Sequence, residues 1–296
     1  MNVCTKINEA FWGGLSYTKC KIAQCFDKPR RRPEIHVTSG MSRPGPRHVR
    51  LERLRKLMES DELEISHING ALQGWARDPV TMVRDVIYFS GYLDPQLKYI
   101  GTDLKNNLSP YIKNPNCMRC KSFAGDAFRS SSIEKCALNA IRWLNTIYRD
   151  SPLDEVHINI IGHSMGARIA ERVAQILHEM PELGEKKYVI RKIISLNGAN
   201  GGSPAAVIAG GLICFTDNIG KNLRPSEVQE EDQHYKKLKS RAIYLAVEND
   251  PVIPPDYAAP PNTPVLVLRD VSRMSPHTAI LNDPVAKYLL IKNLAS

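Results

Sequence analysis

Apolar residues recur along the chain in two spacings, one typical of strands and the other of helices. Short apolar runs predict strands at 63–68, 83–89, 118–124, 156–161, 188–196, 241–247 and 265–268. Apolar positions three and four residues apart predict helices at 51–59, 102–113, 133–148, 165–180 and 281–294. Because parallel strands need long crossover connections, this alternation predicts an α/β fold, a mostly parallel sheet flanked by helices on both faces.

The segment around residue 164 joins one of these strands to the helix that follows it. The sequence Gly162-His163-Ser164-Met165-Gly166 follows the apolar run 156–161 and begins the helix at 165–180. A serine on such a sharp turn exposes its hydroxyl in a strained backbone conformation, and the glycines two residues away relieve crowding. The pattern predicts that Ser164 is a nucleophile. A glycine-lined tight turn with an incidental serine is the alternative interpretation.

A serine nucleophile needs a base, and three histidines follow Ser164 in the chain. His178 lies about four turns into the following helix, which is too far from the serine. His234 lies in a highly charged stretch, which is typical of an exposed surface. His277 lies between the last strand and the last helix, where this architecture places its base. We therefore expect His277 to be the general base.

The base in turn needs an acid to orient it, and this architecture takes that acid from the end of the penultimate strand. The predicted strand 241–247 is followed by Glu248, Asp250 and Asp256. Asp250 lies between these two, next to a proline, and is the leading candidate. Asp256 is the second candidate and Glu248 the third.

Three short segments resemble those of the α/β-hydrolase superfamily, of the lipase and esterase kind. They are GHSMG at 162–166, NDPVIP at 249–254 and SPHTAI at 275–280, and the resemblance covers roughly residues 60–296. The segment 196–204 is similar to a glycine-rich segment of many lipases but lacks their usual proline-histidine pair. That difference weakens any assignment to a subfamily.

The resemblance implies a serine hydrolase that cleaves carboxylic esters, including lipid esters or acyl thioesters, through an acyl-enzyme intermediate. The implied triad is Ser164, His277 and Asp250. No cofactor and no metal is implied. A non-catalytic binding or scaffold protein on a hydrolase fold is the alternative.

An ester hydrolase also needs donors that stabilise the oxyanion of the tetrahedral intermediate. The first expected donor is the backbone N–H of Met165, directly after the serine. The second is expected from the loop after the strand 83–89, where Ser90-Gly91 precedes Tyr92. The segment Ser66–Ala71, which contains a histidine and a glycine, is the alternative source.

The charge of the chain is concentrated in one segment. The protein has 296 residues and a net charge of +9, but Lys28–Lys56 contains ten Lys or Arg and two acids. We expect residues 1–55 to form a basic, partly disordered extension and residues 56–296 to form the hydrolase domain, with a cap or lid at 205–240. A buried helix is the alternative for the apolar stretch 205–215. A solvated extension is the first interpretation of this basic segment, and contact of Lys28–Lys56 with an anionic membrane surface is the alternative. Its few aromatic residues argue against nucleic acid.

The remaining sequence features restrict location and metal content. No run of 18 apolar residues and no secretory pattern occurs, so the sequence predicts a cytoplasmic protein, with export by a signal-independent route as the alternative. Cys117 and Cys120 form a single C-x-x-C without a second pair, which favours structural thiols over a zinc or redox site. The oligomeric state is not indicated.

Overall fold

A seven-stranded sheet forms the centre of the fold. The computed structural model describes residues 34–37, 64–91, 100–123, 132–204, 222–223, 241–260, 263–269, 271 and 276–295. The strands are β1 (Glu34–Val37), β2 (Asp85–Phe89), β3 (Met118–Lys121), β4 (Glu155–His163), β5 (Lys187–Leu196), β6 (Ala242–Val247) and β7 (Pro264–Leu268). Their order is β1-β7-β6-β5-β4-β2-β3. The six strands β2 to β7 are parallel, and β1 is antiparallel to β7. This arrangement confirms the predicted mostly parallel α/β sheet.

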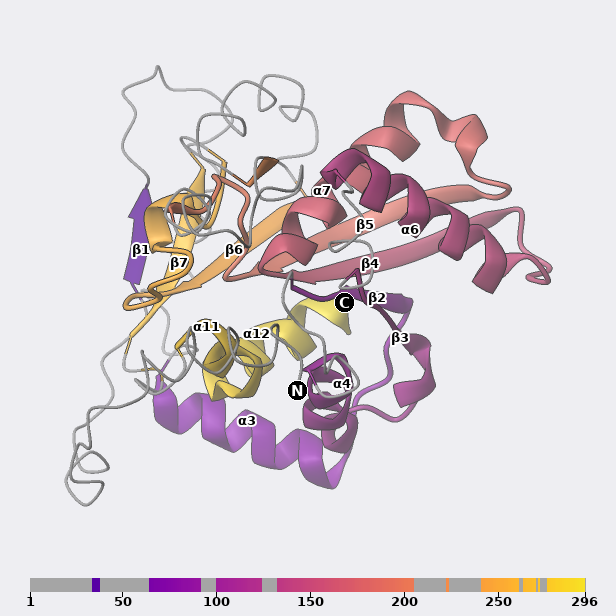
Figure 1. Ribbon diagram of the computed structural model, residues 1–296. Helices are drawn as coiled ribbons and strands as arrows, with labels where there is room; N and C mark the ends of the chain where they lie inside the picture. The colour runs from indigo at the N-terminus through magenta and orange to yellow at the C-terminus, as the bar shows by residue number, and fades with distance from the viewer. Residues whose placement is uncertain are drawn as a thin grey trace, which may run out of the picture.

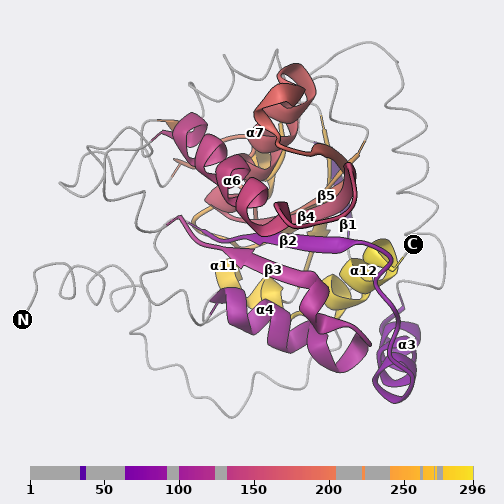
Figure 2. The ribbon, with the colours of Figure 1, turned by 90° about the vertical axis from the view of Figure 1, so that its right-hand side faces the viewer.

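Helices cover both faces of the sheet. The α-helices are α3 (Ile65–Arg77), α4 (Ile100–Leu108), α6 (Ile133–Tyr148), α7 (Met165–Glu179), α11 (Pro276–Ala279) and α12 (Pro284–Leu294). Short 3-10 helices are η3 (Ser109–Tyr111), η4 (Pro115–Cys117), η5 (Pro181–Leu183), η7 (Pro255–Tyr257) and η8 (Ile280–Asn282). Helices α6 and α7 lie on one face, whereas α3, α4 and α12 lie on the other (Figures 1 and 2). None of the helices in the described ranges has both the length and the apolar character needed to cross a bilayer.

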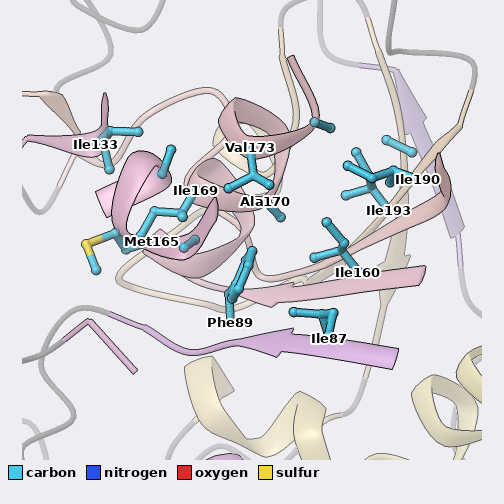
Figure 3. Close-up of a cluster of buried hydrophobic side chains, with 14 of the residues drawn as sticks. Ile87, Phe89, Ile133, Ile160, Met165, Ile169, Ala170, Val173, Ile190 and Ile193 are labelled. Carbon is cyan, nitrogen blue, oxygen red and sulfur yellow. The ribbon is translucent and has the colours of Figure 1, made fainter. Parts of the chain in front are cut away.

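The hydrophobic core has two halves, one on each face of the sheet. Ile160 of β4 packs with Ile169 and Val173 of α7 in the first half (Figure 3). Its neighbour Ile161 belongs to the second half, with Leu290 of α12. Because successive residues of a strand point to opposite faces, a central strand covered on both sides reads as a continuous apolar run. Each such side chain contributes about 1.5–3 kcal/mol on burial.

Side-chain caps fix the start of two helices. Ser132 precedes α6 and its hydroxyl accepts a hydrogen bond from the Lys135 N–H at 3.2 Å. Asp283 precedes α12 and its carboxylate accepts from the N–H groups of Val285 and Ala286 at 2.8 and 3.0 Å. Such caps satisfy amides that the first helical turn leaves unpaired.

The segment predicted as a strand at 63–68 is a helix instead. Helix α3 runs from Ile65 to Arg77 and buries Ile68 and Leu72. One turn later, the Trp75 ring stacks on Tyr288 of α12 with ring centroids 5.5 Å apart. Apolar positions four and three residues apart form one helical face, and this longer spacing outweighs the short apolar run at its beginning.

One part of the predicted basic extension belongs to the sheet. Strand β1 lies within residues 1–55 and pairs with β7 from Glu34↔Val267 to Val37↔Pro264. Its β-branched residues Ile35 and Val37 favour an extended chain, and an edge strand tolerates the preceding Pro33. The rest of the extension and the predicted helix 51–59 lie outside the described residues. Of the predicted cap, 205–240, the structure describes residues 222–223.

Candidate functional site

The residues predicted to carry the chemistry follow the carboxyl ends of three parallel strands. Ser164 follows β4, Asp250 lies three residues beyond β6, and His277 lies in α11 after β7. The exposed fractions of these residues are 9%, 3% and 6%. Parallel strands present their carboxyl ends at one edge of a sheet, which is where α/β proteins commonly bind ligands.

Ser164 has a backbone conformation that residues other than glycine rarely adopt. Its φ is 55° and its ψ is −127°, in the turn between β4 and α7. Such a conformation costs about 1–3 kcal/mol and persists where its surroundings hold it. Here the Ser164 N–H donates to the Leu196 carbonyl, and the Ser164 carbonyl accepts from Ala167 and Ala199, each at 3.1 Å. These three bonds fix the turn from its own helix and from β5.

The glycines on either side of Ser164 leave no room for a side chain. A Cβ on Gly162 would lie 2.3 Å from the Ala167 Cα. A Cβ on Gly166 would lie 2.2 Å from the Phe89 carbonyl oxygen at the end of β2. Both distances are far below van der Waals contact, so glycine is required at both positions. The crowding anticipated from the sequence is therefore present on both sides of the serine.

His277 and Asp250 form a short buried hydrogen bond. The His277 Nδ1 lies 2.6 Å from Asp250 Oδ2. The other carboxylate oxygen, Oδ1, accepts from the N–H groups of Val252 and Ile253 at 2.8 and 3.1 Å. Since a carboxylate only accepts hydrogen bonds, Nδ1 carries the proton, and the second ring nitrogen of a neutral His277 is free to accept one.

The alternative acids and bases lie elsewhere. Glu248 is exposed and forms an ion pair with Arg269 at 3.2 Å, and Asp256 is exposed in η7. His178 is exposed in the last turn of α7. His234 lies outside the described residues. Among these described candidates, Asp250 is the carboxylate that contacts His277.

The loop after β2 reaches Ser164. A Cβ on Gly91 would lie 3.1 Å from the Ser164 Cβ and 3.5 Å from its Oγ. Tyr92, the predicted second oxyanion donor, is the next residue and lies outside the described part of the chain. Met165, the predicted first donor, begins α7, where helical N–H groups are not used within the helix. The alternative segment Ser66–Ala71 lies within α3, which packs on α12.

Two further polar side chains were not singled out in the sequence. His163 Nε2 lies 2.9 Å from the His277 carbonyl oxygen, and Asn197 Nδ2 donates to the same oxygen at 3.0 Å. The exposed fractions of His163 and Asn197 are 2% and 0%. Burial, followed by the nearby His277, lowers the pKa of His163 to about 3. In the sequence, His163 and Asn197 are recognisable as polar residues at the end of apolar strands. This pattern does not indicate which residue each one contacts.

Potential metal ligands do not cluster in the described part of the chain. Within the described ranges, no group of three or more His, Cys, Asp or Glu side chains is arranged to hold an ion. Burial raises the pKa of the Cys117 thiol to about 11, and burial also raises that of Cys120. Both shifts favour the thiol over the thiolate that binds metals and attacks disulfides.

Comparison with known proteins identifies the fold. No family model matches the sequence, and no curated protein matches it. The mature form of the Bacillus licheniformis lipase BlEst2 superposes with a TM-score of 0.51 at 11% identity, over 74% of this chain and 94% of that chain. Its propeptide form gives a TM-score of 0.50 at 13% identity, over 70% and 50%. The metagenomic carboxyl esterase MGS0156 gives 0.48 at 13% identity, over 73% and 77%. The chain therefore has an α/β-hydrolase fold, as its sequence predicted.

Proposed function

We propose that the protein is a serine hydrolase that cleaves carboxylic esters, including lipid esters or acyl thioesters. The observation that carries the proposal is the 2.6 Å bond between His277 and Asp250, at the sheet edge where Ser164 has its strained turn. A buried histidine and aspartate of this kind serve to activate a nucleophile. Similarity in fold to a lipase supports the same chemistry.

In the proposed mechanism, the Ser164 oxygen attacks the ester carbonyl carbon while its proton passes to His277 Nε2. Asp250 stabilises the resulting imidazolium. The N–H groups of Met165 and Tyr92 stabilise the oxyanion. When the tetrahedral intermediate collapses, His277 returns the proton to the leaving alcohol, and the acyl group remains on Ser164.

Water completes the cycle. His277 takes a proton from the water as its oxygen attacks the acyl carbon, and returns it to the Ser164 oxygen as the ester bond to the enzyme breaks. The products are a carboxylic acid and the free enzyme. His277 acts as the base in both steps, so the orientation of its imidazole affects the rates of acylation and deacylation.

The test compares the wild-type chain with Ser164→Ala, using a fluorophosphonate probe and p-nitrophenyl esters of increasing chain length. We expect the wild type to be labelled and Ser164→Ala to lose labelling and about 10⁶-fold in kcat. Ser151→Ala, at the opposite edge of the sheet, is the control and should behave as the wild type. Circular dichroism checks that all three are folded.

Each other outcome has a definite meaning. Full labelling of Ser164→Ala would exclude Ser164 as the nucleophile. A folded wild-type protein that neither reacts with the probe nor hydrolyses any ester would support the alternative, a binding protein on a hydrolase fold. Phospholipids and acyl thioesters, assayed in parallel, would identify the acyl and leaving groups.

A further inference from the structure

The backbone carbonyl of His277 accepts hydrogen bonds from two side chains, one at the end of β4 and one directly after β5. His163, the last residue of β4, approaches it through Nε2 at 2.9 Å. Asn197, the first residue after β5, donates to it through Nδ2 at 3.0 Å. All three residues are buried. The proposed mechanism assigns no task to either His163 or Asn197.

The partners of His163 determine its protonation. A carbonyl oxygen only accepts, so Nε2 must carry the proton in this bond. The low pKa of His163, about 3, keeps the ring neutral, so its Nδ1 has a free lone pair. Among the described residues Nδ1 makes no hydrogen bond, and a Cβ added to Gly91, which follows β2, would lie 3.5 Å from it. The ring therefore acts through Nε2.

The His163 ring also contacts the base itself. The ring centroids of His163 and His277 are 4.9 Å apart with a tilt of 44°. His163 is thus bonded to the backbone of the base and packed against its imidazole. Because His163 adjoins Ser164, the nucleophile and the base are both fixed relative to the end of β4.

Asn197 links His277 to the strand that leads to its acid. Its Oδ1 accepts from the Val247 N–H at 2.8 Å, at the end of β6 and three residues before Asp250. Its Nδ2 also contacts the Pro276 carbonyl at 3.3 Å. The φ of Asn197 is 42°, a conformation that asparagine tolerates better than most residues. One amide therefore connects the loops that carry the acid and the base.

The base needs such support because its own element is short. Helix α11 has four residues, too few to be stable alone. The hydrogen bond to Asp250 fixes the orientation of the His277 imidazole. The backbone of His277 must be fixed by other groups.

We propose that His163 and Asn197 are positioning residues that hold the His277 carbonyl and so set where its imidazole receives and returns the proton. The inference rests on the proposed function, since it concerns the same base. His163, the histidine of the GHSMG segment, would then hold the backbone of the base, His277.

The first test compares His163→Phe with His163→Gln. Phenylalanine keeps a ring in the same space but lacks the N–H, whereas glutamine restores an amide donor. We expect kcat of His163→Phe to fall about 10- to 100-fold with KM unchanged, because a small misplacement of the base slows proton transfer. His163→Gln should recover at least part of this loss. Equal kcat for His163→Phe and the wild type would overturn the proposal, as would a glutamine variant no faster than the phenylalanine one.

Asn197→Gly tests the same carbonyl from the other strand and tolerates the positive φ. Since both donors act on one oxygen, the effects of His163→Phe and Asn197→Gly on kcat should not multiply. Should His163→Phe fail to fold, Asn197→Gly decides alone: unchanged kcat would overturn the proposal. Asn145→Ala is the control for a merely structural role. The buried Asn145 bonds Leu183 and Tyr188 at 3.0 Å near the other sheet edge, so its loss should reduce stability but leave kcat unchanged.

A spectroscopic measurement separates this inference from the proposed function. The proton between His277 and Asp250 should give a downfield proton NMR signal in the wild type, and His163→Phe should shift or broaden it. Absent hydrolysis by the wild type would refute the proposed function, yet a changed signal would still support the positioning role. Hydrolysis by the wild type with the signal and kcat unchanged in both variants would refute the positioning role alone.

Discussion

The candidate catalytic residues at the carboxyl edge of the parallel sheet and an ion pair at its amino edge have opposite surroundings. At the carboxyl edge, Ser164, Asp250 and His277 are buried, and His277 and Asp250 are bonded to each other. At the amino edge, the first residues of β4 and β5, Glu155 and Lys187, form an ion pair at 2.6 Å that is largely exposed to solvent. Apolar side chains are also exposed near this edge, including Leu153 at 60%.

This difference separates stability from function. Exposed ion pairs contribute little to folding because solvent screens them, so the pair at the amino edge has little effect on stability. Buried polar groups destabilise the fold unless each of them is hydrogen-bonded, and a strained backbone destabilises it further. In the described residues both non-glycine positions with positive φ, Ser164 and Asn197, lie at the carboxyl edge. The carboxyl edge therefore carries the features that reduce stability, and the proposed chemistry depends on this same edge.

Among the substitutions that test this difference, Asp250→Asn should have the largest effect, a loss in kcat. An asparagine amide can donate to Nδ1 of His277 and so favour the tautomer whose Nε2 carries the proton and no longer accepts one. In comparable triads this exchange lowers kcat about 10⁴-fold, and we expect the same here from steady-state kinetics. Asp85→Asn at the start of β2 is the matched control and should leave kcat unchanged. A loss below tenfold in Asp250→Asn would remove Asp250 from the mechanism.

Gly166→Ala should disturb the carboxyl edge through packing. The added Cβ would lie 2.2 Å from the Phe89 carbonyl, so α7 must move away from β2. We expect a loss of about 3 kcal/mol in the free energy of unfolding, measured in urea.

Gly70→Ala provides the contrasting substitution. Gly70 lies in the middle of α3 with nothing within 4 Å of its Cβ position. Alanine there should stabilise the protein by about 0.5–1 kcal/mol, because glycine is a poor helix former. Similar losses at both positions would mean that the close contact at Gly166 does not determine its effect.

Local patterns predicted the central sheet and the proposed triad because both are encoded in short segments. Strand β4 is an unbroken apolar run, and its turn has the glycine spacing of a serine elbow. The order of Ser164, Asp250 and His277 then left few candidates for acid and base. In each case the informative residues lie within a few positions of one another or follow a fixed chain order.

Contacts between distant segments could not be predicted in the same way. Strand β1 pairs with β7 more than two hundred residues later, and the prolines and arginines around it resemble an extension. The run at 63–68 is short enough to suit a strand or a helix, and the packing of Trp75 on α12 decides between them. His163 and Asn197 meet His277 across 114 and 80 residues, and periodicity carries no information about such pairs.

Tyr148→Phe tests the amino edge and should have a small effect. The Tyr148 hydroxyl, at the end of α6, donates to Asp85 Oδ2 at 2.7 Å. Burial, followed by this bond to Asp85, raises the pKa of Tyr148, so the hydroxyl keeps its proton and remains a donor. Since 31% of the Asp85 side chain is exposed, water can replace the lost donor, and we expect a loss of about 1 kcal/mol in the free energy of unfolding. A double-mutant cycle with Asp85→Asn would assign that loss to the bond, and kcat should stay at the wild-type value. A fall in kcat without loss of stability would mean that the two edges are coupled and that the amino edge also supports the chemistry.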